Sequence, residues 1–268
     1  MSAVEPDGFE CVRFERLEGH VLQVTIDRPG DPLNRVDDRL HEELGRLFGV
    51  LREENAARAV LLTGEGRAFS AGGDFAWFPA LQDPEIAEQV RRQGKHLIWD
   101  LLDVPVPIVC CLNGHAVGLG ASIALLCDAT FMAASATIGD PHVRVGIVAG
   151  DGGTVAWPLA IGPMAAKRWL LTGDPVPADE AARLGLVTEA WPDDEVHDRA
   201  LAFARRLAAG APLAIQYTKQ AVNKLVKDAL NTSFDVSTAL ELLTFRSHDH
   251  QEALAAMVEK RDPNFEGM

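Results

Sequence analysis

Short apolar runs that alternate with helical patterns limit most strongly what this chain can fold into. Residues 59–63 and 107–112 are apolar runs of strand length, and residues 21–26 have strand chemistry before a turn. Between them, apolar residues recur at helical spacing over 40–51 and 86–101. The alternation continues to about residue 190, which predicts an α/β architecture with a buried parallel sheet.

The character of the sequence changes after Trp191 and Pro192. From 195 to 260 every periodic segment is helical, with breaks near 210–212 and 247–250. We therefore predict a core over residues 1–194 and a helical region over 195–268. Its apolar faces need cover from the core or from another subunit, so oligomerisation is expected.

Charge and composition exclude several functions. The 268 residues are 47% hydrophobic and carry a formal charge of -14, with a pI near 5.0. Nucleic acid or an anionic membrane surface would require a basic footprint, so neither is an expected partner. No apolar run reaches membrane-spanning length and the N-terminus lacks a signal-peptide pattern, so we expect a cytoplasmic protein.

The four cysteines, Cys11, Cys110, Cys111 and Cys127, show no metal-ligand spacing. Cys110 and Cys111 are neighbours within an apolar run, which is typical of buried free thiols. No metal site is predicted.

Residues 139–153 form a segment too rich in glycine for regular secondary structure, and they include His142 and Asp151. Loops held between apolar elements often carry reactive side chains. His142 and Asp151 are therefore the first catalytic candidates. The alternative is structural, with His142 bonded to a loop carbonyl and Asp151 to backbone amides.

Two further glycine-rich turns, 68–74 and 113–122, each follow a predicted strand. Their backbone N–H groups could together bind a ligand oxygen, aided by the helix that begins after the second turn. Tight turns with packing glycines are the alternative. A dinucleotide fingerprint, a P-loop and a nucleophile elbow are each incomplete.

An ordered set of motifs spans nearly the whole chain and resembles the crotonase (enoyl-CoA hydratase/isomerase) superfamily. The motifs are Arg-Ala-Val-Leu-Leu-Thr-Gly at 58–64, Ala-Phe-Ser-Ala-Gly-Gly-Asp at 68–74, Pro-Ile-Val-Cys-Cys-Leu-Asn-Gly at 107–114, Cys-Asp at 127–128, Leu-Thr-Gly at 171–173, Ala-Ala-Arg-Leu-Gly-Leu-Val at 181–187 and Glu-Lys-Arg at 259–261.

The resemblance implies a spiral of ββα units with a helical C-terminal trimerisation region, assembled as a homotrimer or a dimer of trimers. It implies an acyl-CoA thioester as ligand, with coenzyme A as part of the substrate and no separate cofactor. The thioester carbonyl would be held by the backbone N–H groups of Ala71 and Leu119.

Two glutamates of the family's hydratases are replaced here by Ser122 and His142. Serine has no useful acid–base range, so the two-glutamate hydration mechanism does not carry over. Histidine titrates near neutral pH, and Asp151 could orient it or raise its pKa. We therefore expect His142, assisted by Asp151, to be the acid–base group of an enolate-forming lyase or isomerase.

Three alternatives remain open. The 139–153 segment is similar to that of the β-diketone hydrolases typified by 6-oxocamphor hydrolase, which implies retro-Claisen cleavage of a carbon–carbon bond. Ser122 with His142 and Asp151 has the residue types of a nucleophilic triad. Loss of the glutamates would also permit a non-catalytic acyl-CoA binder.

The resemblance also suggests pocket residues. Ser122 would leave room for a larger acyl group, and Phe75, Gly118 and His115 are the other candidates. For His115 a structural role is the alternative. Lys260 is the candidate contact to the CoA phosphates, because Phe75 and Ala76 stand where many relatives have a lysine or arginine.

Overall fold

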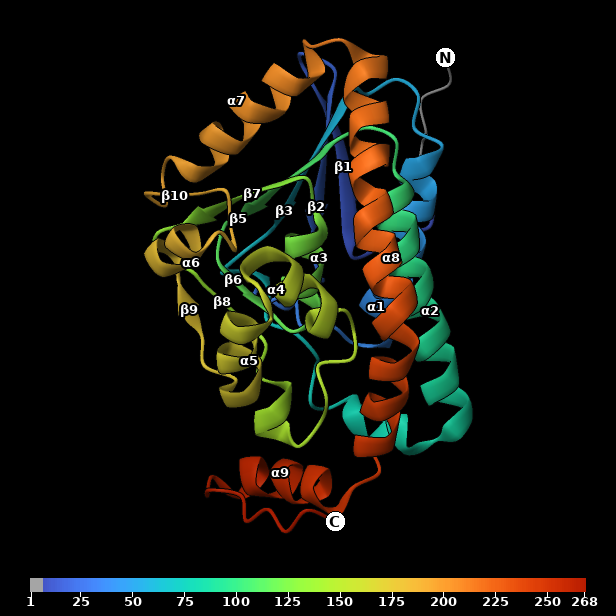
Figure 1. Cartoon of the computed structure of the whole chain (residues 1–268), viewed down its shortest axis with the longest axis vertical. Coiled ribbons are helices and arrows are strands. Elements are labelled where there is room, and N and C mark those ends of the chain that lie inside the picture. The colour runs from blue at the N-terminus through green and yellow to red at the C-terminus, as the bar shows by residue number, and fades with distance from the viewer. Residues whose placement is uncertain (1–6) are drawn as a thin grey trace.

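Two β-sheets organise the part of the chain that the computed structural model describes, residues 7–268 (Figure 1). The larger sheet has the spatial order β1 (Val12–Leu17), β2 (Val21–Ile26), β3 (Ala59–Gly64), β5 (Ile108–Leu112), β7 (Ala129–Ala133) and β10 (Glu189–Trp191). Only β1 pairs antiparallel, with β2, and every later pair is parallel. The predicted parallel sheet is confirmed.

The smaller sheet consists of short strands that the sequence pattern did not reveal. They are β4 (Ala68–Ser70), β6 (His115–Val117), β8 (Thr137–Gly139) and β9 (Val176–Pro177). Strands of two or three residues are too short to show an alternating pattern, and three of them lie in or beside the segments read as glycine-rich turns and loop.

Three successive ββα units give the fold its spiral. Each unit places its first strand in the larger sheet and its second in the smaller, and then continues into a helix. The units are β3-β4-α2, β5-β6-α3 and β7-β8-α4, with helices α2 (Pro84–Asp103), α3 (Leu119–Leu126) and α4 (Gly153–Ile161). The predicted ββα architecture is confirmed. None of the helices among residues 7–268 is apolar over a length that would cross a bilayer.

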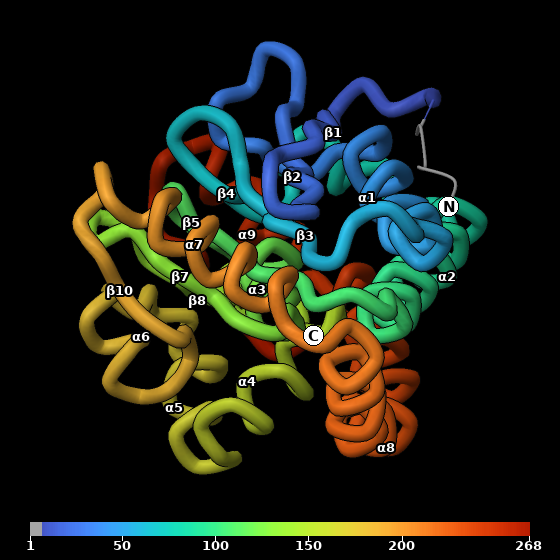
Figure 2. The backbone as a smooth tube through the Cα atoms, turned by 90° about the horizontal axis from the view of Figure 1, so that it is seen from above, coloured from blue at the N-terminus to red at the C-terminus, as the bar shows by residue number. Residues whose placement is uncertain are grey.

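The remaining helices cover the sheets and complete the chain (Figures 1 and 2). They are α1 (Asp38–Arg52), α5 (Pro163–Thr172), α6 (Ala178–Leu184), α7 (Val196–Ala208), α8 (Pro212–Thr244) and α9 (His248–Glu259), with the 3₁₀ turns η1 (Phe78–Gln82) and η2 (His142–Val145). Helix α1 begins where the Asp37 side chain accepts from the N–H of Leu40, and its leucine face is buried in the core.

Helix α8 runs beside α2 (Figure 1), and the two pack together. This contact brings the C-terminal region against the core of the same chain. The predicted breaks are confirmed, since α7 ends at Ala208, α8 begins at Pro212 and α9 begins at His248.

Candidate active site

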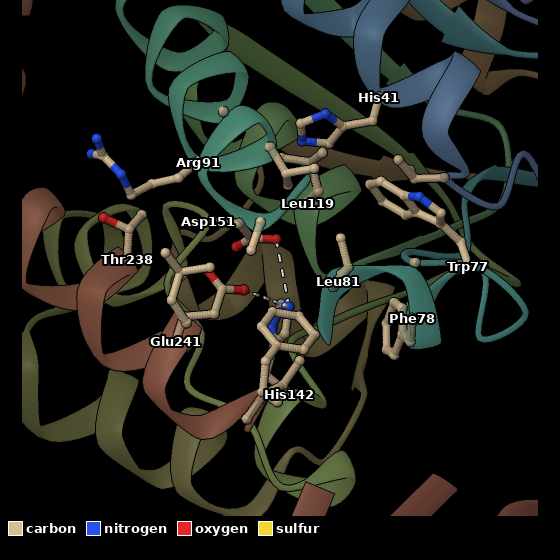
Figure 3. Close-up of a pocket in the computed structure, with 18 of the residues that line it drawn as sticks. His41, Trp77, Phe78, Leu81, Arg91, Leu119, His142, Asp151, Thr238 and Glu241 are labelled. Atoms are coloured by element: carbon tan, nitrogen blue, oxygen red, sulfur yellow. Dashed lines mark ion pairs between the residues drawn. The ribbon is translucent and has the colours of Figure 1, made fainter. Parts of the chain in front are cut away.

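Two adjoining cavities lie beside η2 and the start of α3. The larger, shown in Figure 3, is also lined by helix α8. The larger measures about 790 Å³ with its open mouth included, and the smaller about 340 Å³. Both are lined by Gly73, Phe78 and His142. The volume of the larger cavity and its mostly apolar walls are typical of a small-molecule site.

His142 lies among three carboxylates. Its Nδ1 bonds Asp140, while its Nε2 lies 3.6 Å from Oδ2 of Asp151 and 4.0 Å from Oε1 of Glu241. Figure 3 shows the last two side chains converging on the imidazole from the loop and from α8. Each ring nitrogen therefore faces negative charge.

The carboxylates determine the protonation of His142. Burial lowers the pKa of the imidazole, but the charges of Asp140, Asp151 and Glu241 and the hydrogen bond to Asp140 outweigh burial and raise the pKa to about 10. His142 is therefore a cation at neutral pH. The sequence-based expectation that Asp151 would shift this pKa upward is confirmed in direction, with Asp140 the stronger influence.

Glu241 and Asp151 hold protons more tightly than ordinary carboxyl groups. Burial is the main cause of both raised pKa values. The negative charge of Asp151 further raises the pKa of Glu241, and the charge of Asp140 raises the pKa of Asp151, although His142 and the Ser122 hydrogen bond oppose the shift in Asp151. The pKa of Glu241 is raised well above its usual value, although His142 opposes the shift. The cavity thus combines an imidazolium with a carboxyl group that favours its neutral form.

Glycines make room for this cluster. A Cβ on Gly150 would lie 2.5 Å from Oε2 of Glu241, and one on Gly153 would lie 2.1 Å from Oδ2 of Asp140. Gly118 has φ +55°, and a Cβ there would meet the His142 ring at 3.2 Å. The glycine content of the loop therefore reflects close approach of acidic side chains.

Ser122 supports Asp151 from behind the cavity. Its hydroxyl donates to Oδ1 of Asp151 at 3.1 Å, and its side chain has no exposed surface. It lines neither cavity, and the expectation that its small side chain leaves room for a larger acyl group stays a prediction. With its hydroxyl committed to Asp151 and no direct bond to His142, it also lacks the geometry of a triad nucleophile.

The prediction that Ala71 supplies an amide to a ligand oxygen is wrong, because its N–H donates to the carbonyl of Leu33 at 2.9 Å. Leu119 begins α3 and lines the larger cavity. Gly73, two residues beyond Ala71, lines both cavities. Within residues 7–268, the backbone hydrogen bonds include none donated by Gly73 or Leu119.

The other predicted pocket residues divide into two groups. Phe75, which is 44% exposed, and Gly118 line the smaller cavity. His115 bonds Thr137 through Nδ1 at 2.9 Å and lies outside both cavities, so its pocket assignment is wrong. Lys260 ends α9 on the surface and lines neither cavity.

Sequence reasoning missed Asp140, Glu241 and His41. Asp140 belongs to the same loop as His142, but nothing in the pattern distinguishes it from a turn residue. Glu241 shares a helical face with Thr238 and the apolar cavity residues of α8, and polar residues at that spacing were the available signal. His41 was hidden within the leucine pattern of α1.

His41 adds a neutral polar group to the larger cavity. It is 6% exposed, its Nδ1 lies 3.0 Å from Oε1 of Gln93, and its ring lies 5.6 Å from that of Trp77. Burial lowers the pKa of this imidazole, against a smaller opposing effect of Gln93. Since Nδ1 donates to an amide oxygen, Nε2 of the neutral ring carries the lone pair.

Asp140, His142 and Asp151 have the residue types and spacing of a cation site, with ligand atoms within 4.8 Å of one another. Each ring nitrogen of His142 already faces a carboxylate, however. A protonated imidazole supplies the positive charge that a metal ion would bring, so acid–base chemistry accounts for the cluster.

Comparison with known proteins gives a consistent result. A sequence model described as enoyl-CoA hydratase/isomerase matches residues 16–268. The 1,2-epoxyphenylacetyl-CoA isomerase of Escherichia coli (strain K12) is 31% identical, over 95% of this chain and 98% of that protein. A probable enoyl-CoA hydratase of Rhodobacter capsulatus is 32% identical, over 97% and 99%.

Solved structures of similar proteins lead to the same family. An enoyl-CoA hydratase/isomerase from Mycobacterium paratuberculosis superposes with a TM-score of 0.88 and 35% identity, covering 93% of this chain and 99% of that one. A β-diketone hydrolase from the cyanobacterium Anabaena, bound to (S)-3-oxocyclohexyl acetic acid, gives 0.83 and 31%, covering 88% and 94%.

Proposed function

Since the chain belongs to the enoyl-CoA hydratase/isomerase family, we propose that it is an enzyme that forms and reprotonates an enolate of an acyl-CoA thioester. The observation that carries the proposal is the place of His142, which lines both cavities and lies among three carboxylates. A proton carrier at such a junction reaches a substrate that occupies both cavities.

The N–H groups of Gly73 and Leu119 are the proposed donors to the thioester oxygen. Both residues line the larger cavity, and neither N–H is used by the backbone of the described residues. The N–H groups of a helix's first turn lack intrahelical acceptors, so the start of α3 offers both a donor and a favourable field. Such donors stabilise the negative charge that develops on the oxygen.

His142 is proposed as the general acid and Asp151 as the base. A carboxylate removes a proton from the carbon next to the thioester. The electron pair of that C–H bond forms a carbon–carbon double bond, and the π pair of the carbonyl moves to its oxygen. The imidazolium then returns a proton to a carbon of the enolate. An imidazole with a pKa near 10 suits donation rather than removal at neutral pH.

The phosphates of coenzyme A would require a cationic contact on the protein. Arg28, beside the first turn, is already paired with Asp37 at 2.9 Å and Asp74 at 2.8 Å. Lys260 is exposed and is the proposed phosphate contact. Comparing acyl-CoA with the same acyl group on pantetheine tests this, because only the former carries the nucleotide phosphates.

A specific observation favours a second function, retro-Claisen cleavage of a β-dicarbonyl compound. The superposed Anabaena structure is a β-diketone hydrolase, and Glu241 adds a carboxyl group that favours its neutral form to His142 and Asp151. In this reaction water adds to one carbonyl as its proton passes to a carboxylate. The bond to the neighbouring carbon then breaks, and that carbon takes a proton, giving a carboxylic acid and a ketone.

The deciding experiment is a substrate panel with mass detection of products. It should contain enoyl-CoA, 3-hydroxyacyl-CoA and cyclic β-diketones, each tested with the wild type, His142→Asn and His248→Asn. His248 is an exposed histidine of α9 and serves as control. We expect CoA-ester turnover that falls by roughly 10²-fold or more in His142→Asn only. Binding without turnover would instead indicate a non-catalytic acyl-CoA binder.

We further propose that a homotrimer, or a dimer of trimers, covers the apolar side chains that α8 leaves exposed. These are Leu213, Tyr217, Val222, Leu225, Val236, Leu240 and Leu243. An apolar surface of this extent is typical of a contact with another protein surface.

A further inference from the structure

The catalytic loop is tied to the C-terminal helices at three points. His250 donates from Nδ1 to the carbonyl of Val145 at 2.7 Å. The N–H of Val148 donates to the hydroxyl of Thr244 at 3.1 Å, and the hydroxyl of Ser237 reaches the carbonyl of Gly150 at 3.4 Å. Of these three hydrogen bonds, only the first acts on η2, the turn that carries His142, which also lies 4.0 Å from Glu241 of α8.

His250 serves the proposed chemistry from a site fully enclosed by the protein. Its side chain has no exposed surface, and its ring centroid lies 5.8 Å from that of Phe78 and 5.1 Å from that of Phe245. Both phenyl rings line the larger cavity. The histidine therefore touches the aromatic wall and the catalytic turn together.

The imidazole makes one hydrogen bond and leaves its other nitrogen unpaired. Nε2 of His250 is buried without a partner among the described residues. A buried polar atom without a partner destabilises the fold, and an apolar side chain of similar size would avoid that cost. A histidine here is explained by the bond that it does make, to Val145.

The fit between α9 and η2 is close enough for this bond to fix the turn. A Cβ on Gly146 would lie 2.9 Å from the backbone nitrogen of His250. That same nitrogen donates to the Ser247 hydroxyl that caps α9, at 3.1 Å. The position of the imidazole is thus set by a helix end packed directly against the turn.

Burial also favours the neutral form of the His250 ring, which donates to the Val145 carbonyl. It lowers the pKa of His250, against a smaller opposing effect of the Val145 carbonyl, so the ring is neutral at neutral pH. Because the partner is a carbonyl, the proton of the neutral ring must lie on Nδ1. The donor is always in place.

We propose that His250 is a positioning residue: its bond to the Val145 carbonyl holds η2 so that His142 stays among Asp140, Asp151 and Glu241. The inference rests on the proposed function only in taking His142 as the proton donor. Without the bond, the turn shifts, the carboxylates act on His142 less strongly, and the pKa of His142 falls from about 10 toward its ordinary value of 6.5.

The test is an NMR titration of His142 in protein labelled at histidine, with its signal assigned by its loss in His142→Asn. His250→Asn places an amide N–H close to the position of Nδ1, whereas His250→Gln places it nearer Nε2 and His250→Leu has none. We expect a pKa near that of the wild type in His250→Asn and in the control His248→Asn. A decrease of at least one unit is expected in His250→Gln and His250→Leu.

Two outcomes distinguish a positioning role of His250 from a role in the stability of the fold alone. A folded His250→Leu or His250→Gln with an unchanged His142 pKa would overturn it, whatever the loss in melting temperature. If the leucine variant does not fold, the Asn and Gln pair decides by the same criterion. The titration needs no substrate, so its result remains valid even if the proposed reaction is wrong. In activity assays, kcat/KM should fall on the order of tenfold only in those variants in which the pKa of His142 falls.

Discussion

Oε1 of Glu241 lies 4.0 Å from Nε2 of His142, although one residue comes from helix α8 and the other from a loop of the core. Helix α8 therefore contributes a wall and a carboxyl group to the candidate site of the same chain. That residues 195–268 form a separate region for contact with other subunits remains a prediction.

Removing the nearest charge should weaken His142 as an acid. Asp140 is buried and bonds Nδ1, so Asp140→Asn deletes the strongest of the charges that raise the pKa of His142. We expect a His142 pKa lower by at least one unit and a kcat/KM lower by roughly 10-fold or more. Asp193→Asn, which alters an exposed partner of Ser135 outside both cavities, is the control. Equal effects of both changes would contradict the assignment.

The pH dependence of activity should show a falling limb near pH 10, where His142 loses its proton. A profile of kcat/KM that instead rises toward pH 10 would mean that His142 acts as the base.

The pH dependence of stability has the same origin. The pKa of His142 is higher in the folded state than its ordinary 6.5, so its contribution is fully present below about pH 6.5 and is lost as pH rises through about 10. The raised pKa values of Asp151 and Glu241 act in the same direction. Urea unfolding at pH 6, 8 and 10 should show a smaller decline in the free energy of unfolding for His142→Asn than for the wild type.

Two glycines of the cavity wall should respond differently to alanine. A Cβ at Gly73 would lie 2.4 Å from the ring of Phe78, so Gly73→Ala should displace that ring and weaken ligand binding about tenfold or more. At Gly94, inside α2, nothing lies within 4 Å. Gly94→Ala should leave binding within twofold and stabilise the fold by about 1 kcal/mol. Calorimetry and urea unfolding measure both.

Ser122→Ala distinguishes support from nucleophilic attack. If the hydroxyl only holds Asp151, kcat/KM should fall on the order of tenfold, because one hydrogen bond to the Asp151 carboxylate is lost. Ser135→Ala, which removes a hydroxyl bonded to Asp193 outside the cavities, is the matched control. Complete loss of turnover in Ser122→Ala alone, with trapped acyl-enzyme in the wild type, would restore the acyl-serine mechanism.

Leu225→Glu should disrupt the proposed assembly. Leu225 is 71% exposed on α8, so the substitution costs little within the chain but places charge in an apolar contact. Sedimentation should show smaller species than the wild type, with Lys224→Glu as a neighbouring control. An unchanged sedimentation coefficient would place the subunit contact elsewhere.

The sequence predicted the elements whose pattern is long enough to repeat. The spacing of the leucines predicted helix α1, and the short apolar run predicted strand β3. The order of the family motifs predicted how the ββα units are joined. Short strands such as β4 have no measurable pattern, because three residues cannot show alternation.

Within the candidate site, the sequence revealed residues that belong to a local pattern and missed those that only packing brings to the cavity. His142, Asp151 and Leu119 all line the larger cavity. The first two were selected because they share one glycine-rich segment, and Leu119 was selected by its position in the family motifs. Glu241 belongs to the site only through packing of α8 against the core, which no local pattern records. The prediction for the N–H of Ala71 is wrong because this N–H donates to the carbonyl of Leu33, which lies in a turn distant in the sequence.

The cavity walls come from α1 and α2 early in the chain and from α8 late in it. During synthesis on a ribosome, both sheets can therefore form while one side of the cavity is still missing. A nascent chain that ends before α8 contains Gly73, Leu119 and His142 but lacks the wall that would shield the proposed enolate from water. Activity should appear abruptly, when the last wall has emerged and docked, rather than grow in proportion to chain length.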